Sequence, residues 1–480
     1  MNRAASERLY LALDQGGHAS RALVFDGRGA LLAKGLEEVR VRHPQPGWVE
    51  QDPEELVASL HSAAAAALRQ LGARAARPTS AGLATQRASI VCWDRVSGAA
   101  LSPVISWQDV RAHAWLEQFA PRADDIHRRT GLRLSAHYGA SKLRWCLEHL
   151  PAVAAAHREG RLAFGPLAAF LIFRLLEERP QLVDPANAAR TLLWNLTTMD
   201  WDPELLALFG LPRAALPACV PTRHRFGNLR VGGHVLALEI LTGDQSAALF
   251  AHGAPRPDTA YINMGTGAFI QRALGRHPGD AAGLLTGVVF RDDAEVVYTL
   301  EGTVNGAGAA LQWLEEEHGL KDVERDLPGW LDRDGAPPLF LNGVSGLGAP
   351  FWVPDFPSGF IGAGEPWQQA VAVAESIVFL LQVNLEELRR HDPAPREILV
   401  TGGLSWYDGL CRRLADLSEL PVYRPAEYES TARGLTYLLA GRPAAWPEPR
   451  PGTWFQPEQN PALQERHRRW RAEMQRALGN

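Results

Sequence analysis

The chain has 480 residues, of which 46% are hydrophobic and 21% charged, a composition typical of a folded protein with more than one core. Its net charge of −5 gives no electrostatic basis for binding nucleic acid or an anionic membrane surface. The four cysteines lack the spacing of a zinc site, and the longest apolar run, 167–173, is too short to cross a bilayer, so we expect a cytoplasmic protein with free thiols.

The first predicted element is a buried strand over residues 9–13 that ends at Asp14. A glycine-rich turn, Gln15-Gly16-Gly17-His18-Ala19-Ser20, leads into a second strand over 21–26, and a third is expected over 30–41. Glycines let backbone N–H groups approach an anion closely, and Asp14 is placed to bind a metal ion through water. An acid beside a glycine turn is common, so this hairpin alone does not identify a site.

Asp52-Pro53-Glu54-Glu55 is a strong helix start, and the helix is expected to run to Leu71. A strand over 81–84 then leads to Arg87, and a later apolar segment leads to Trp107. Polar and aromatic residues at successive strand ends predict a ligand pocket, because open α/β sheets bind ligands there. Taken singly, Arg87 fits a surface ion pair and Trp107 a half-buried core residue.

The middle of the chain predicts a change of domain. Residues 111–179 are expected to be mainly helical, and 184–196 to form a loop entering a strand. Residues 202–240 contain many prolines and are expected to form only short elements. We therefore place a domain boundary near residue 240, which divides the chain into 1–240 and 241–480.

The second half begins with an acid, Asp244, that follows a small-residue turn and opens an Ala-rich helix. Read alone, this acid is as readily a helix cap as a catalytic base. Residues 261–271 then repeat the strand, glycine turn and strand of the N-terminus, with Gly265-Thr266-Gly267 as the turn. Two halves that each open with such a hairpin predict a duplicated α/β unit with a nucleotide between its halves.

The rest of the second half alternates strands and helices. A strand over 296–300 precedes a helix that Gly306-Ala307-Gly308 opens and that includes Gln312. After a Gly- and Pro-rich loop and a long helix over 367–390, a strand over 397–400 ends at Thr401-Gly402-Gly403, a natural seat for a nucleotide at the start of a helix. Helices over 430–440 and from residue 461 complete the chain.

Two common nucleotide-binding motifs are missing from the sequence. No Gly-Lys dipeptide occurs, which excludes a P-loop, and no Gly-x-Gly-x-x-Gly follows a predicted strand, which argues against a dinucleotide-binding Rossmann domain. Paired glycine hairpins, an acid at the first strand's end and a later Thr-Gly-Gly turn remain. These features favour the actin-like ATPase architecture: an α/β protein with two ribonuclease H-like domains and the active site in the cleft between them.

Further motifs run through the whole chain in a fixed order. They are Leu11-Ala12-Leu13-Asp14-Gln15-Gly16, Ser20-Arg21-Ala22, Gln86-Arg87, Trp107-Gln108-Asp109, Gly243-Asp244-Gln245-Ser246-Ala247-Ala248-Leu249-Phe250, Gly265-Thr266-Gly267, Leu300-Glu301-Gly302, Gln312-Trp313-Leu314, Gly348-Ala349-Pro350-Phe351-Trp352 and Gly402-Gly403. In these motifs the chain resembles the FGGY family of carbohydrate kinases, specifically its glycerol-kinase branch. The resemblance covers about residues 9–475.

The resemblance implies a kinase that uses ATP and Mg²⁺. Asp244 matches the general base that takes a proton from the substrate hydroxyl, and Asp14 and Asp244 match the acids at the metal. The residues that match nucleotide- and phosphate-binding positions are Gly16, Gly17, His18, Arg21, Gly265, Thr266, Gly267, Gly308, Gln312, Gly402 and Gly403. Those that match substrate-binding positions are Arg87, Trp107, His137, Asp244, Gln245 and Phe269.

The sequence departs from the family pattern at the substrate side. Ala88 stands where glycerol kinases have a glutamate that binds glycerol hydroxyls, and His137 stands where they have a tyrosine. Losing a carboxylate that accepts hydrogen bonds removes about 1.5–3 kcal/mol of binding. These changes predict that glycerol is a poor substrate and leave space for a larger one.

The nucleotide side departs as well. The first hairpin carries Gly17, His18 and Ala19 in place of two threonines and a serine, and Tyr407 replaces an asparagine near the adenine. Three hydroxyl donors are thus replaced by one imidazole. His18 either contacts the ATP phosphates or lies exposed at the hairpin tip, and the sequence leaves both interpretations open.

The predicted function is ATP-dependent phosphorylation of a sugar or polyol hydroxyl, without optimisation for glycerol. Glycerol kinase is the alternative in the same class, and a catalytically degenerate protein that binds nucleotide or sugar for regulation is the alternative in another. The expected partner is a small-molecule sugar or polyol, with neither nucleic acid nor membrane. The resemblance also implies a homodimer or homotetramer.

Overall fold

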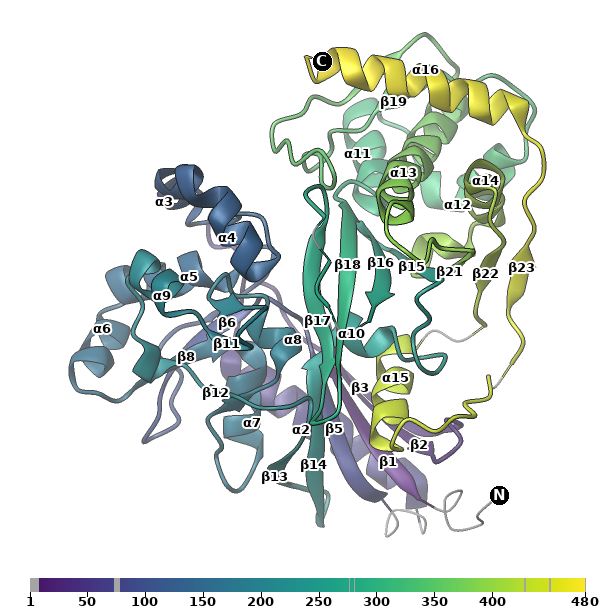
Figure 1. Ribbon diagram of the computed structural model, residues 1–480. Helices are drawn as coiled ribbons and strands as arrows, with labels where there is room; N and C mark the ends of the chain where they lie inside the picture. The colour runs from purple at the N-terminus through teal and green to yellow at the C-terminus, as the bar shows by residue number, and fades with distance from the viewer. Residues whose placement is uncertain are drawn as a thin grey trace.

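The computed structural model describes residues 8–72, 78–275, 277–279, 281–426, 429–448 and 450–479. Figure 1 shows two lobes, one formed mainly by the N-terminal half and one by the C-terminal half, each with a central sheet and flanking helices. The predicted α/β class with two sheet-based units is therefore present. None of the helices in these described ranges is both long and apolar enough to cross a membrane.

The first sheet has six strands in the order β13-β14-β5-β1-β2-β3. Their bounds are β1 (Leu9–Gln15), β2 (Ala19–Asp26), β3 (Leu31–Glu38), β5 (Pro78–Thr85), β13 (Arg223–Val231) and β14 (His234–Gly243). The strands β1, β5 and β14 are mutually parallel, and their last residues, Gln15, Thr85 and Gly243, pair in register. Three segments from distant parts of the sequence consequently leave the sheet at the same edge.

Helices pack on the first sheet and cover its apolar residues. Asp52 caps α2 (Pro53–Leu71) as predicted, and the helix packs on β2 and β3. Contact is close because Gly35 has no side chain: a Cβ there would lie 2.0 Å from the Ala63 carbonyl oxygen. Near the C-terminus, α15 (Ser430–Leu439) returns to pack on β1 and β5.

A four-stranded sheet, ordered β4-β7-β6-β8, and a group of helices extend the first lobe. The strands are β4 (Glu50–Gln51), β6 (Ile90–Asp94), β7 (Val104–Ile105) and β8 (Leu162–Pro166). The helices are α3 (His113–Leu116), α4 (Ala123–Thr130), α5 (Gly139–His149), α6 (Pro151–Arg158), α7 (Leu167–Leu175), α8 (Pro185–Ala188) and α9 (Pro203–Phe209). Two short pairs join them: β9 (Leu182–Val183) with β12 (Ala218–Cys219), and β10 (Trp194–Asn195) with β11 (Asp200–Trp201).

The second sheet has seven strands in the order β17-β18-β16-β15-β21-β22-β23. They are β15 (Thr259–Met264), β16 (Ala268–Leu274), β17 (Leu285–Arg291), β18 (Val296–Val304), β21 (Glu397–Thr401), β22 (Val422–Arg424) and β23 (Thr453–Phe455). Around it lie α10 (Asp244–Ala248), α11 (Gly308–His318), α12 (Val323–Leu331), α13 (Pro366–Arg389), α14 (Asp408–Ser418), α16 (Pro461–Ala477) and the pair β19 (Leu339–Leu341) and β20 (Gly359–Ile361). Most of α13 is buried, which makes it the central helix of this lobe.

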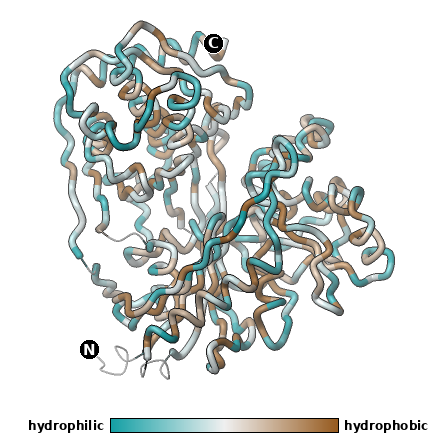
Figure 2. The backbone as a smooth tube through the Cα atoms, turned by 180° about the vertical axis from the view of Figure 1, so that it is seen from behind, coloured by the Kyte–Doolittle hydropathy of each residue, from teal (hydrophilic) through white to brown (hydrophobic). Residues whose placement is uncertain are grey.

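Apolar residues form one core in each half and a third cluster that both halves share. The shared cluster includes Tyr10 and Leu23 from the first sheet and Phe250, Leu435 and Trp446 from later in the chain. Seen from behind in Figure 2, hydrophobic stretches run through both lobes, and many outer loops are hydrophilic. The predicted boundary near residue 240 stays a prediction, since β14 continues to Gly243 and α15 packs on the first sheet.

The expectation for residues 202–240 was wrong. Instead of short elements alone, this segment contributes β13 and most of β14, two long strands of the first sheet. The hairpin between them turns at Gly232 and Gly233, both with positive φ (56° and 82°). A Gly-Gly pair between apolar runs is a known hairpin signal, which the high proline content of the surrounding segment obscured.

Candidate active site

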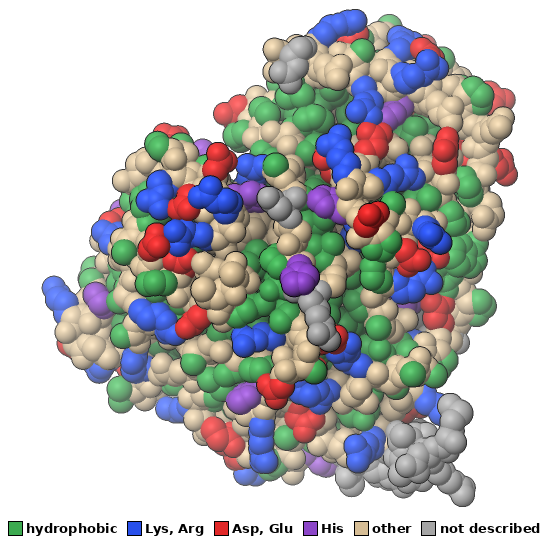
Figure 3. Space-filling view, viewed as in Figure 1, with side chains coloured by type: hydrophobic (Ala, Val, Ile, Leu, Met, Phe, Trp, Pro, Cys, Tyr) green, Lys and Arg blue, Asp and Glu red, His purple; other side chains and the backbone are tan. Residues whose placement is uncertain are grey.

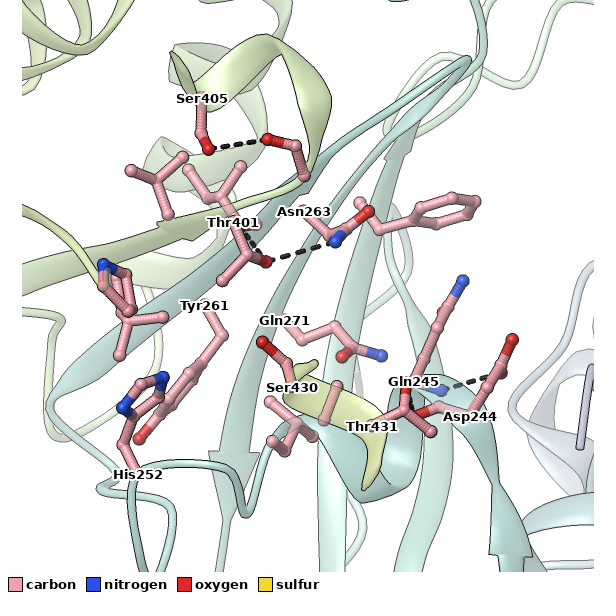
Figure 4. Close-up of a pocket in the computed structure, with 18 of the residues that line it drawn as sticks. Asp244, Gln245, His252, Tyr261, Asn263, Gln271, Thr401, Ser405, Ser430 and Thr431 are labelled. Atoms are coloured by element: carbon pink, nitrogen blue, oxygen red, sulfur yellow. Dashed lines mark hydrogen bonds between the residues drawn. The ribbon is translucent and has the colours of Figure 1, made fainter. Parts of the chain in front are cut away.

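A cavity of about 490 Å³ lies between the second sheet and the first turns of α10 and α15. Figure 4 shows Asp244 and Gln245 at one end of it and Thr401, Asn263 and Ser405 toward the other. The cavity is lined by Asp244, Gln245, Ala248, Leu249, His252, Tyr261, Ile262, Asn263, Phe269, Gln271, Leu399, Val400, Thr401, Gly402, Gly403, Ser405, Trp406, Pro425, Ser430 and Thr431. Of the predicted site residues, this cavity collects Asp244, Gln245, Phe269, Gly402 and Gly403.

Asp244 is the first residue of α10, and its backbone position differs from the one expected. The N-cap is Gly243, so the prediction that Asp244 caps the helix was wrong by one position. Its carboxylate instead accepts a hydrogen bond from the backbone N–H of Gln245 at 2.7 Å. The side chain is 30% exposed, toward the cavity, and desolvation by the surrounding protein raises its pKa.

Arg87 reaches the same place from the end of β5. Its Nη2 donates to the side chain of Gln245, and its Nε lies 4.0 Å from the Asp244 carboxylate. A Cβ on Gly243 would lie 2.5 Å from the Arg87 side chain, so the glycine before Asp244 makes room for this arginine. The structure thus brings Arg87 to the neighbouring residues Asp244 and Gln245, from which it is far apart in the sequence.

Behind Arg87 lies a buried ionic network. Glu301 accepts hydrogen bonds from Arg87 at 3.3 Å, from Arg190 at 2.6 Å and from Gln271 at 2.6 Å. Burial alone would raise the pKa of Glu301, but the two arginines and Gln271 lower it to about 2. Charge-assisted hydrogen bonds of this kind hold Arg87 in place beside Asp244.

Sequence reasoning did not single out Arg190 or Gln271. A signal for Gln271 was present, since it lies two residues after Phe269 in a predicted strand and therefore on the same face. Arg190 carried no such signal. It lies in the turn after α8, and only the tertiary structure brings it to Glu301.

Asp14 is the second-last residue of β1, just before the turn of the first hairpin, and is almost fully buried. Burial and the negative charge of Asp244 raise its pKa to about 7, while Arg21, 3.7 Å away, opposes the shift. Burial, together with the charge of Asp244, thus disfavours the charged carboxylate more than Arg21 favours it. Carboxylate oxygens in such a setting are suitable ligands for a hard divalent cation.

The first hairpin is held by hydrogen bonds to its backbone carbonyls. Gly16 N–H donates to the Ala19 carbonyl at 2.9 Å, and Gln51 donates to the Gly17 carbonyl at 2.8 Å. His18 lies exposed at the tip, and Val39 N–H donates to its carbonyl at 2.9 Å. These loop residues do not line the cavity of Figure 4.

The second hairpin is docked against the start of α11. The Gly265 carbonyl accepts from Gly308 N–H at 2.9 Å, and the Thr266 carbonyl accepts from Ala307 and Ala309 at 3.1 and 2.9 Å. A Cβ on Gly308 would lie 2.9 Å from the Gly265 oxygen, so glycine is needed for this approach. The structure thereby joins three of the predicted phosphate-side residues through their backbones.

Gln312 and the Gly-Gly turn after β21 are placed differently. The Gln312 side chain donates to Glu316 on the exposed face of its own helix, and it does not line the cavity. Gly402 has a φ of 92° and packs against the end of β15, where a Cβ would lie 2.4 Å from the Met264 oxygen. Gly403 beside it has open space, with nothing within 4 Å of a Cβ.

Trp107 and His137 form a pair in the first lobe. Trp107 is 37% exposed, and His137 is also exposed to solvent. The Nδ1 atom of His137 lies 3.0 Å from the Trp107 carbonyl oxygen, which can only accept, so Nδ1 carries the proton and Nε2 keeps a lone pair. The surrounding protein lowers the pKa of His137 by desolvation, which keeps the imidazole neutral at pH 7.

Besides Thr401, which the Thr-Gly-Gly turn had indicated, polar groups that the sequence did not single out line the cavity. Asn263 donates to the Thr401 hydroxyl at 3.1 Å, joining β15 to β21, and the Thr431 hydroxyl reaches the Asp244 carbonyl at 3.4 Å. Thr431 comes from α15, almost 190 residues after Asp244, so no local pattern could have placed it here. Figure 3 shows charges of both signs interspersed over the face viewed.

Comparisons with known proteins give matches along most of the chain. Residues 9–250 match the N-terminal domain, and 260–441 the C-terminal domain, of the FGGY family of carbohydrate kinases. The glycerol kinase of Delftia acidovorans is 36% identical over 89% of both chains, and that of Aromatoleum aromaticum 34% identical over 98% of both.

Solved structures show the fold. A Plasmodium falciparum glycerol kinase with ADP superposes with a TM-score of 0.88 at 21% identity, over 98% of each chain. A xylulose kinase from Rhodospirillum rubrum gives 0.86 at 20% identity, over 98% of this chain and 99% of its own. The predicted actin-like, two-domain architecture is confirmed.

Proposed function

The chain belongs to the FGGY family of carbohydrate kinases, and we propose that it transfers the γ-phosphate of ATP to a hydroxyl of a polyol or sugar. One observation carries the proposal. Asp14, Arg87 and Asp244 lie at or just after the carboxyl ends of the three parallel strands β1, β5 and β14, which end in register at one edge of the sheet. Ligands bind at such edges of α/β sheets.

In this mechanism Asp244 accepts the proton of the acceptor hydroxyl. The hydroxyl oxygen attacks the γ-phosphorus, and ADP leaves. The raised pKa of Asp244 makes it a more effective base than an exposed aspartate, whose pKa is lower. The Gln245 N–H orients the carboxylate, and Arg87, itself held by Glu301, fixes its position. Positioning of this kind supplies much of the catalysis in phosphoryl transfer.

Mg²⁺ is the metal that such a kinase requires, and the residues present suit it. The almost fully buried Asp14 carboxylate, with its raised pKa, is the group that would hold it, and Asp244 lies close enough to add negative charge. Bound Mg²⁺ would neutralise charge on the ATP phosphates. We assign the phosphates to the two glycine hairpins and the nucleoside to the Gly402–Gly403 end of the cavity.

We propose an acceptor other than glycerol. Ala88 brings no carboxylate to the acceptor side, and the exposed His137, bonded through Nδ1 to the Trp107 carbonyl, keeps the lone pair of Nε2. A neutral hydroxyl donor suits such a wall, and the small side chain of Ala88 leaves space for additional carbons. The 34–36% identity to glycerol kinases supports glycerol itself as the second candidate.

The test is ADP release from ATP and Mg²⁺ across a panel of glycerol, four- and five-carbon polyols, ketoses and sugar acids. We expect the highest kcat/KM for a substrate longer than glycerol, with Asp244→Asn as the inactive control. A clear preference for glycerol would establish the second candidate. Calorimetric binding of ATP with no turnover of any acceptor would instead indicate a binding protein and contradict the proposed reaction.

A further inference from the structure

Lys142 is one of three lysines in a chain with 49 lysine and arginine residues, and its side chain is completely buried. It lies in the first turn of α5, directly after the segment that carries His137. Among the described residues it forms no ion pair. A fully buried ammonium without a carboxylate partner is costly unless hydrogen bonds satisfy it.

Three backbone carbonyls satisfy it. The Lys142 ammonium donates to the carbonyl oxygens of Ser106 at 2.6 Å, His137 at 2.7 Å and Ala88 at 3.4 Å. An ammonium has three N–H donors, so each is directed to a different chain segment. Burial lowers the pKa of Lys142 to about 7, partly offset by the charge of Asp109.

Each of those three segments carries an acceptor-side residue of the proposed site. Ala88 follows Arg87, Ser106 precedes Trp107, and His137 is itself the third. Ala88 also has a φ of 62°, a conformation that a non-glycine residue keeps only when its surroundings impose it. Lys142 supplies one of those constraints through the Ala88 carbonyl.

We propose that Lys142 is a positioning residue that sets the distances among Arg87, Trp107 and His137 and thereby the shape of the acceptor pocket. The effect on acceptor binding rests on the proposed function. The role of Lys142 in holding the three segments rests only on its own hydrogen bonds. It acts through backbone carbonyls and does not touch the reacting atoms.

Lysine suits this place better than arginine does, although arginine is the chain's usual cation. Its compact ammonium can direct three N–H groups to carbonyls on different sides, whereas the planar guanidinium directs its donors in one plane. Lys142→Arg is therefore not expected to restore the function of a variant without the ammonium.

The test compares Lys142→Met with Lys34→Met, a control at an exposed lysine that pairs with Glu429. In the ligand-free protein we expect faster backbone hydrogen exchange in Lys142→Met within 86–91, 104–109 and 135–140, and unchanged exchange in 264–268. Equal exchange in those three segments for both variants would overturn the proposal. Lys142→Gln, which keeps two N–H donors, should be intermediate, and it replaces Lys142→Met if that variant fails to fold.

Kinetics give the second measurement. We expect Lys142→Met to raise the KM of the acceptor by about 10- to 100-fold, the range for misplaced site residues, with the KM of ATP and kcat changed much less. Equal increases in both KM values would indicate a general structural role and contradict the proposal. If the wild type phosphorylates no acceptor, the proposed function fails, while hydrogen exchange still tests the role of Lys142.

Discussion

At the phosphate-transfer end of the site, the carboxylates meet charged side chains: Arg87, which also belongs to the acceptor side, lies between Asp244 and Glu301, and Asp14 lies near Arg21. At the acceptor wall, by contrast, side chains meet the backbone. His137 bonds the Trp107 carbonyl, and Lys142 bonds three more carbonyls. The wall's shape thus depends little on the identity of its exposed side chains. Specificity can change there by single substitutions while the transfer chemistry stays intact.

The largest effect expected is that of Asp244→Asn. Removing the base should lower kcat by about 10²–10⁴-fold, while calorimetric ATP affinity stays close to that of the wild type. Asp293→Asn, at an exposed acid, is the control. If Asp244→Asn changed only the KM of the acceptor, Asp244 would act in acceptor binding and not in phosphate transfer, which would contradict the proposed division of the site.

Ala88→Glu tests the acceptor wall from the opposite direction. The added carboxylate can accept hydrogen bonds from glycerol hydroxyls, worth about 1.5–3 kcal/mol, so the KM of glycerol should fall by about 10- to 100-fold. Steady-state kinetics on glycerol and on the preferred acceptor measure the switch. Ala88→Gln adds the same length and an acceptor oxygen without the charge, and an equal effect from it would show that the negative charge is not needed.

The two hairpins should respond differently to alanine. A Cβ on Gly267 would lie 3.2 Å from the Val304 carbonyl, so Gly267→Ala should destabilise the fold by about 1–3 kcal/mol. Gly17 has nothing within 4 Å, and Gly17→Ala should leave the Tm unchanged. Thermal unfolding measures both. Equal losses would mean that the first hairpin is packed as tightly as the second.

The smallest effect expected is the pH dependence at His137. Its lowered pKa keeps the imidazole neutral at pH 7, so protonation of Nε2, which stops it accepting, should raise the acceptor KM only at more acidic pH, apart from any change that Lys142 causes near pH 7. Competition from other titrating groups is controlled with His137→Gln, which keeps an acceptor oxygen. The same rise in that variant would rule out His137 as its source.

Much of the fold followed from local patterns. Both glycine hairpins and the cap of α2 at Asp52 depend on residues close together in sequence, and they form where expected. The strands β13 and β14 were missed because β13 lies in a segment where prolines hid the hairpin signal. Asp244 was predicted to be the N-cap of α10, but it is the first helical residue. Acids are favoured at both positions, so the sequence pattern did not separate them.

The sequence by itself determined which residue types stand at each turn and strand end: Asp14 before one glycine hairpin, Arg87 after a strand, and Asp244 at a helix start. It also determined the chemical change at the acceptor side, Ala88 and His137. Only the tertiary structure decided that β1, β5 and β14 end in register, that Glu301 binds Arg87 with Arg190 and Gln271, and that Lys142 bonds three carbonyls. The reason is that hydrogen bonds between distant segments depend on strand order and packing, which local propensity does not encode.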